Sequence, residues 1–190
     1  MAILKIARMG HPVLLSRAEP VSDPSAPEIR RLVGDMMETA VDADAAGLAA
    51  PQVHVPLRLF VFRCRPERVT DDPEDVPTEP DLQVVINPEV EAAGEEIALA
   101  WEGCLSIPGL RGAVPRPARV RYRGVDLEGR PIDRTVGGFH ARVVQHEFDH
   151  LNGILYPMRM EDFALFGFTE EIARAAYAAA QGPRAGGRDG

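Results

Sequence analysis

Apolar residues recur at helical spacing in the segment that follows Pro27. They stand three or four positions apart, as Ile29, Leu32, Val33, Met36, Met37, Ala40 and Val41. Such spacing places them on one face of a helix. Ser25 and Pro27 suit the start of this helix, as cap and first-turn residue. We therefore expect an amphipathic helix in this segment.

Strand and turn patterns follow in the middle of the chain. The side chains of AAGLAAPQV are small and its residues favour turns, so this segment does not continue the helix. In LRLFVF, the alternation and the branched or aromatic residues predict a strand. LQVVINPEV and VRYRGVDLEGRPIDRTV indicate further antiparallel strands, separated by Asn-Pro, Arg-Gly and Glu-Gly turns. Residues 65–81 hold four prolines, many acids and no apolar face, which predicts an exposed loop and not a domain linker.

Two more helices are expected in the last third of the chain. Apolar residues at helical spacing between Gly138 and Asn152 predict a helix over 139–151. Residues 161–181 are rich in alanine, which favours a helix there. The terminal GPRAGGRDG, residues 182–190, is too polar and glycine-rich to be ordered by its own packing.

Length and composition are those of an ordinary globular protein. A chain of 190 residues, 45% apolar and 26% charged, can form one compact domain with its own core. No apolar run approaches the roughly 20 residues of a membrane helix, and MAILKIARMG lacks the long apolar stretch of a secretory signal. We therefore expect a cytoplasmic protein that does not use a membrane.

Charge and cysteine content narrow the function classes. The formal charge of -8 argues against a broad surface for nucleic acid, so DNA is not an expected partner. A local basic set is better interpreted as alternating strand residues: Arg111, Arg116, Arg119, Arg121 and Arg123. Cys64 and Cys104 are the only cysteines, fewer than a secreted fold stapled by disulfides would carry, so either thiol is free to be a ligand.

The strongest chemical signal is QHEFDH. His146 and His150 are four positions apart and project from the same face of the predicted helix, where they can share one metal ion. Glu147 lies beside them. The alternative is a pair of packed, hydrogen-bonded core histidines.

A second motif, EGCLS, strengthens the metal interpretation. Gly103 allows close backbone approach, and a thiolate at Cys104 could complete a Cys-His-His site. Three protein ligands with water in the fourth position are typical of a catalytic metal site, whereas a structural site fills all four positions. The alternative for Cys104 is a buried apolar residue.

The remaining cysteine and histidines carry no such signal. Cys64 has no ligand at suitable spacing, and His11, His54 and His140 are interpreted as surface or structural residues.

A third motif, GLAAPQ, spans 47–52. Its small residues let a ligand or another chain approach the backbone, and Gln52 offers an amide donor.

GLAAPQ, EGCLS and QHEFDHLNG, in this order and spacing, resemble the motifs of peptide deformylases. The resemblance extends from ILKIARMGHPVL at Ile3, through INPEV, to about Met160. It implies an α+β fold in which small antiparallel β-sheets surround a central metal-binding helix that carries HExxH. It also implies an enzyme that hydrolyses a linear amide, removing the formyl group from the initiator methionine of new polypeptides and releasing formate.

The resemblance assigns roles to residues that match its motifs. It implies metal ligands at Cys104, His146 and His150, and a general acid/base at Glu147. It further implies an oxyanion site that combines the Gln52 amide with the backbone N–H of Leu105. A metal-bound water or hydroxide would be the nucleophile.

Cofactor, partners and domain limits follow from the same resemblance. One divalent ion per chain is expected, Fe²⁺ in the cell, although a thiolate and two imidazoles also suit Zn²⁺, Ni²⁺ or Co²⁺. The partners would be N-formylmethionyl peptides and, during translation, the ribosome. The catalytic domain would span 1–165, with a helical extension and flexible tail over 166–190.

One position departs from the family pattern. Deformylases usually begin the first motif with G-x-G, whereas this chain has Ala45, Ala46 and Gly47. An alanine costs little at ordinary φ, but its methyl group would narrow the cleft if the substrate needs close approach. Gly47 and Arg111 are candidate peptide contacts, Arg111 because it follows EGCLS closely; a solvated loop arginine is the alternative.

Two rival functions are compatible with the motifs. HExxH also occurs in zinc metallopeptidases, which take their third ligand from a later His or Glu. No histidine follows His150, so Glu170 or Glu171 would have to serve, and Cys104 has the better claim. The second rival is an inactive homologue that binds peptide ends, which Ala45 mildly favours and an intact Glu147 opposes.

Overall fold

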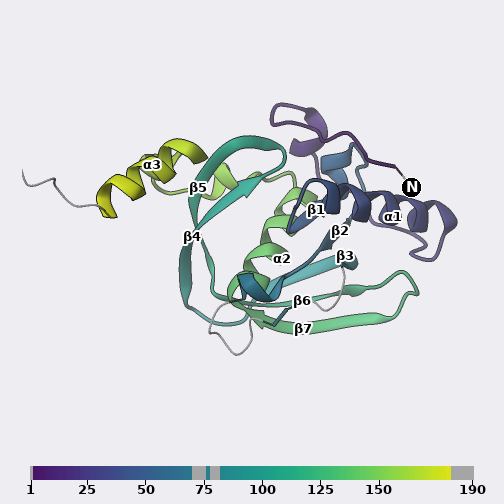
Figure 1. The fold of residues 1–190 in the computed structure, drawn as a ribbon. Coiled ribbons are helices and arrows are strands. Elements are labelled where there is room, and N and C mark those ends of the chain that lie inside the picture. Colours follow the sequence, from purple (N-terminus) through teal and green to yellow (C-terminus); the bar gives the residue numbers. More distant parts are fainter. Residues whose placement is uncertain (1, 70–75, 78–81, 181–190) are drawn as a thin grey trace, which may run out of the picture.

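The structure, a computed structural model, describes residues 2–69, 76–77 and 82–180. Two antiparallel sheets pack against one central helix, α2, which spans Gly138–Leu151 (Figure 1). The larger sheet has the order β1-β2-β3-β6-β7, with bounds Gly47–Ala49, Leu59–Phe62, Gln83–Ala92, Arg119–Val125 and Pro131–Gly137. The smaller sheet has the order β4-β5-β8, with bounds Ile97–Cys104, Ile107–Pro117 and Phe166–Phe168. The predicted α+β class with antiparallel sheets is confirmed.

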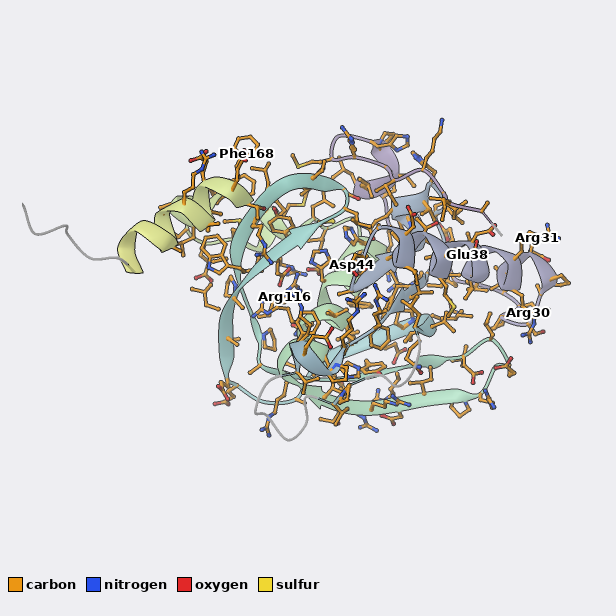
Figure 2. The ribbon with its side chains drawn as sticks, in the orientation of Figure 1. Arg30, Arg31, Glu38, Asp44, Arg116 and Phe168 are labelled. Carbon is orange, nitrogen blue, oxygen red and sulfur yellow. The ribbon has the colours of Figure 1, made fainter. Side chains whose placement is uncertain are left out.

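Helix α1, Pro27–Asp42, confirms the first predicted helix and packs against β1 and β2. Its apolar face joins one side of the larger sheet, through Ile29, Val33, Met36, Ala40, Leu48, Leu59 and Val61. Arg30 and Arg31 project from the same helix to the outside (Figure 2). Each large apolar side chain buried in this way stabilises the fold by about 1.5–3 kcal/mol.

Strand β2 holds the centre of the fold because both of its faces are buried. Leu59 and Val61 face α1, whereas Phe60 and Phe62 face the cluster that includes Val144 of α2. The larger sheet therefore carries α1 on one side and α2 on the other. This arrangement fixes the helix whose residues form the candidate site.

Two details of the first predicted helix are wrong. Val41 is 56% exposed, because it lies one position, about 100°, round the helix from the buried Ala40. Ser25 does not cap the helix: its hydroxyl donates to Asp23, and Ala26 occupies the cap position without a side-chain hydrogen bond.

Two predicted turns lie inside strands. Asn87 sits in β3 at a register shift, with φ of 52°, and its side chain exchanges two hydrogen bonds with the backbone of Val21. Gly124 lies within β6, where an added Cβ would come within 2.7 Å of Val85 Cγ1. Asn87 therefore stabilises a β-bulge, and Gly124 allows β6 to lie close to Val85 of β3. The turn at Glu128-Gly129 between β6 and β7 is confirmed, with Gly129 at φ of 72°.

The sequence interpretation missed the long hairpin β4–β5, although IALAWEGC has strand alternation. The helix predicted over 161–181 begins later than expected, because Gly112 and its neighbours on β5 pair with β8. Helix α3 spans Thr169–Ala180 and projects away from the body of the molecule (Figure 1).

Parts of two predictions lie outside the described residues. Within the predicted loop 65–81, Pro66–Arg68 forms a short exposed 3-10 helix, whereas 70–75 and 78–81 are not described. The predicted unstructured tail, 182–190, is likewise outside the described part. In the part that is described, no helix combines the length and apolar character that crossing a membrane requires.

Candidate active site

Helix α2 brings two histidines to one face, next to the end of β4. His146 and His150 are one turn apart, with ring centroids 5.0 Å apart and ring planes at 76°. Cys104 is the last residue of β4, at the turn into β5, and its Sγ lies 3.3 Å from His150 Nε2. The ligand atoms of these three residues all lie within 4.8 Å of one another.

This cluster fits a divalent metal ion. Tetrahedral coordination with metal–sulfur distances of about 2.3 Å and metal–nitrogen distances of about 2.0–2.1 Å places ligand atoms roughly 3.3–3.6 Å apart. The cluster needs only small side-chain shifts to reach that spacing. Across the described residues, no other group of three His, Cys, Asp or Glu side chains offers such an arrangement.

Protonation of the cluster also suits a metal. Burial opposes ionisation of Cys104, but the charge of His150 and hydrogen bonds from both histidines hold the pKa of the thiol well below its ordinary value. Burial would lower the pKa of His146, yet contacts with Cys104 and Glu102 hold it well above its ordinary value. The thiolate is the metal-binding form, and a bound cation would displace the imidazole proton.

A buried carboxylate orients the first histidine. Glu102 on β4 accepts a hydrogen bond from Nδ1 of His146 at 2.8 Å, which leaves Nε2 for a metal. Arg116 binds the same carboxylate through two hydrogen bonds, of 2.6 and 2.9 Å, and Arg142 adds one of 2.7 Å. Burial opposes ionisation of Glu102, but its bonds to His146 and Arg116 hold its pKa well below the ordinary value.

The same network ties the smaller sheet to α2. Arg116 donates to Asp149 at 2.8 Å, and Arg159 pairs with the other oxygen of Asp149 at 2.7 Å. Arg116 lies beside α2, on the side of β4 and β5 (Figure 2). Removing one partner from such a network leaves an uncompensated buried charge. These ion pairs therefore hold the position of β4, and with it Cys104, relative to the histidines.

Glu147 lies on the cavity side of α2 and is 4% exposed. Its Oε2 has no hydrogen-bond partner among the described residues, and burial raises its pKa to about 7. A carboxyl group with such a pKa can both accept and donate a proton near neutral pH. Gly47 makes room for it, because a Cβ at that position would stand 2.3 Å from Glu147 Oε1.

Gln52 reaches the same site from the short 3-10 helix Ala50–Val53. Its Oε1 accepts the backbone N–H of Ala49 at 2.9 Å, so its amide NH₂ faces the site. Nε2 lies 3.4 Å from Cys104 Sγ and 3.2 Å from Ser106 Oγ. Leu105 follows Cys104 in the turn and lines the same cavity. Both predicted oxyanion donors are thus close to the ligand cluster.

A cavity of about 450 Å³ opens in front of these residues. It brings together almost all of the predicted site residues: Gly47, Gln52, Cys104, Leu105, Arg111, His146 and Glu147. His150 is not part of the wall and is only 1% exposed, so it lies beneath the cavity floor. Arg111 extends from β5 opposite Gly103.

Ala45 also lines the cavity. Its φ is not positive, since the positive-φ residues other than glycine are Asp44, His54 and Asn87. Alanine therefore causes no backbone strain at the position where deformylases usually have glycine. Its methyl group adds only bulk to the cleft wall.

Other cavity residues escaped the sequence interpretation. Phe139 and Val143 precede His146 on the same stripe of α2, at spacings of four and three. That helical period was available in the sequence. Trp101 lies on the missed strand β4, and Arg68 belongs to the proline-rich segment, where no periodic pattern marks it.

The residues excluded from the site lie elsewhere. Cys64 is fully buried in the apolar core. His140 is buried beside Tyr122, with its Nε2 3.3 Å from the hydroxyl oxygen. His11 and His54 are exposed and contact each other edge to face, with centroids 4.7 Å apart. None of them belongs to the ligand cluster.

Comparison with known sequences agrees with this geometry. The family model described as polypeptide deformylase matches residues 3–165. Peptide deformylase 1 of Nitrosomonas europaea is 49% identical, over 90% of this chain and 94% of that protein. Peptide deformylase 2 of Ralstonia nicotianae is 51% identical, over 88% and 93% respectively.

Solved structures give the same result. The complex of an Ehrlichia chaffeensis peptide deformylase with actinonin has a TM-score of 0.78 and 30% identity, and the match covers 96% of this chain and all of that one. A class I type b peptide deformylase from Acinetobacter baumannii, bound to Met-Ala-Ser, has a TM-score of 0.73 and 36% identity, covering 83% and 99%.

Proposed function

The chain belongs to the polypeptide deformylase family and removes the N-formyl group from nascent polypeptides, and we propose that Cys104, His146 and His150 hold the metal on which this reaction depends. The observation that carries the proposal is the cluster of three ligand atoms within 4.8 Å, next to a buried carboxyl group in one cavity. The metal-binding helix is then α2, with its HExxH residues.

Glu147 is the proton carrier in this proposal. A divalent ion held by these three residues would lower the pKa of a bound water and so supply hydroxide near neutral pH. Glu147 accepts the proton that this water loses, and donates it to the departing amine after the formyl carbon has been attacked. The C–N bond breaks, and formate and a free amino terminus result. The raised pKa of Glu147 and its unpartnered oxygen support this role.

Gln52 and Leu105 stabilise the charge that develops on the formyl oxygen. The amide of Gln52 is held by Ala49 with its NH₂ toward Cys104, so it is already oriented before substrate arrives. The backbone N–H of Leu105 is the second donor. Fixed donors of this kind lower the barrier because they need no reorganisation during the reaction.

The metal and the substrate contacts are further parts of the proposal. Fe²⁺ is the metal expected in the cell, and the ligand set also accepts Zn²⁺, Ni²⁺ or Co²⁺. N-formylmethionyl peptides are the substrates, with Gly47 and Arg111 on the cavity wall as peptide contacts. The peptide in the Acinetobacter baumannii complex, Met-Ala-Ser, supports this substrate class.

We also propose the division of the chain and its place of action. Residues 1–165 form the catalytic domain, and 166–190 form an extension whose first strand, β8, pairs with β5. The protein acts in the cytoplasm on chains that emerge from the ribosome.

The test is a formate-release assay on anaerobically purified protein. The substrate is formyl-Met-Ala-Ser, and the acetylated peptide is the control. We expect formate from the formyl peptide alone, with about one metal ion per chain. Bound metal without formate release would instead favour a binding role, and peptide-bond cleavage would favour the metallopeptidase alternative. Glu170 and Glu171 of α3 are not in the ligand cluster, which opposes that alternative.

A further inference from the structure

The cavity carries a guanidinium group that the mechanism above does not use. Arg68 ends the 3-10 helix that follows β2, and it lines the cavity together with Arg111. Within the described part of the chain, no ion pair or side-chain hydrogen bond engages the guanidinium of either residue. Among the described residues, these two positive charges at the mouth of the site therefore have no ionic partner.

The other charges around the mouth are balanced. Asp44, labelled in Figure 2, is paired with Arg63 at 3.2 Å and also with Arg65. Deeper in the cavity, Arg142 is paired with Glu102. Among the described residues, the surplus at the mouth is therefore positive, on a protein whose formal charge is -8. Unpaired cations at the opening of a cavity favour the approach of anionic groups.

Contact with an aromatic ring fixes the position of Arg68. Its Cζ lies 4.9 Å from the ring centroid of Phe139, within cation–π range. Phe139 stands seven residues before His146 on the cavity-lining stripe of α2, which corresponds to about 10 Å along the helix axis. An extended peptide advances about 3.3 Å per residue, so a peptide that runs along α2 from the ligand cluster would bring its third residue level with Phe139.

We propose that Arg68 is a specificity-determining residue that, with Arg111, favours formylated peptides carrying Asp or Glu at their second or third residue. This inference rests on the proposed function, because the peptide must enter with its formyl group at the ligand cluster. An ion pair at a partly exposed site is weak and screened by salt. The preference is therefore modest, about two- to fivefold in kcat/KM, and it falls with ionic strength.

The experiment compares isosteric peptide pairs on the metal-loaded enzyme. Formyl-Met-Ala-Asp-Ser is compared with formyl-Met-Ala-Asn-Ser, and formyl-Met-Asp-Ala-Ser with formyl-Met-Asn-Ala-Ser. We expect an Asp/Asn ratio of kcat/KM above one for at least one pair. Arg68→Gln should lower that ratio toward one, because only Arg111 then remains, and Arg68→Glu should lower it further. Because each ratio is measured on one protein preparation, a change in folded fraction cancels.

The matched control is Arg174→Gln, which removes an exposed arginine of α3 that is paired with Glu171 and lies outside the cavity. It should keep the wild-type ratio. The inference would be overturned if the wild-type Asp/Asn ratio of kcat/KM were one for both peptide pairs, or if Arg68→Glu left that ratio unchanged. Failure of formyl-Met-Ala-Ser to release formate would instead overturn the proposed function, so the two failures are distinct.

Discussion

Buried charged groups on the two sides of helix α2 differ in how many hydrogen bonds they make. On the side of the smaller sheet, Glu102, Arg116 and Asp149 are buried, and each is bound by at least two partners. On the cavity side, Glu147 Oε2 has no partner among the described residues. Two further buried atoms lack a partner within that part of the chain: Nδ1 of His150, whose other ring nitrogen faces Cys104, and the hydroxyl of Tyr156. Buried polar groups are normally satisfied, so each exception calls for an explanation.

This difference indicates that the ion-paired residues position the site, whereas Glu147 takes part in the reaction. The ion pairs of Glu102, Arg116 and Asp149 fix where the ligands stand. Glu147, whose Oε2 has no hydrogen-bond partner among the described residues, keeps its capacity to accept a proton. Substitutions among the ion-paired residues should therefore change stability, whereas substitutions at or beside Glu147 should change turnover.

Glu147→Gln should have the largest effect on activity. It keeps the shape of the side chain beside Gly47 but cannot carry the proton, so kcat should fall by about 10²–10⁴-fold. Metal content and melting temperature should stay near the wild-type values, because Glu147 is not a ligand in the proposed site. Elemental analysis beside formate release checks both points, and loss of metal in this variant would contradict the division of roles.

Arg116→Met should affect stability rather than chemistry. It removes the cation between Glu102 and Asp149 and leaves both carboxylates buried, which should cost about 3–5 kcal/mol. Denaturant unfolding measures this change. The protein that remains folded should still bind metal and release formate. A variant of unchanged stability would show that the ion network is not structural.

Gly47→Ala should impair catalysis by crowding the proton carrier. The added Cβ would stand 2.3 Å from Glu147 Oε1, so that carboxyl group must move. A displacement of about 1 Å at a reacting group can cost on the order of 10²-fold in rate. Kinetics on formyl-Met-Ala-Ser, with metal content as the control, test this. Wild-type kcat would mean that Glu147 does not act from its observed position.

Ala45→Gly should have the smallest effect. Ala45 has no positive φ, so glycine relieves no strain and only adds freedom to the unfolded chain, which costs about 0.4–1 kcal/mol. The turnover of a small peptide should change little. A large gain in activity would show that the alanine methyl group obstructs the substrate.

The sequence predicted the site better than the strands around it. His146 and His150 meet because helical spacing leaves them no other arrangement, and the helix that carries them was predicted at nearly its observed limits. Cys104 is different, since it lies more than forty positions away in the sequence, and its place as third ligand was inferred from the EGCLS motif and then from the family resemblance. Spacing alone could not have joined them.

Long-range contacts explain most of the errors. Asn87 has the sequence signal of a turn, but its side chain binds the backbone of Val21, sixty-six positions earlier, and stabilises a bulge. Residues 166–168 form a strand because β5 offers an edge for pairing, which local helix propensity does not reveal. Arg68 lies in a segment without periodicity and reached the cavity only through tertiary packing.

X-ray absorption of the zinc-loaded enzyme tests the central claim most directly. We predict one sulfur ligand at about 2.3 Å and two imidazole nitrogens at about 2.0–2.1 Å, with a fourth, oxygen ligand from water. Glu147→Gln should leave this spectrum unchanged, and Cys104→Ser should remove the sulfur. A wild-type spectrum without a sulfur ligand, or one altered by Glu147→Gln, would contradict the proposed site.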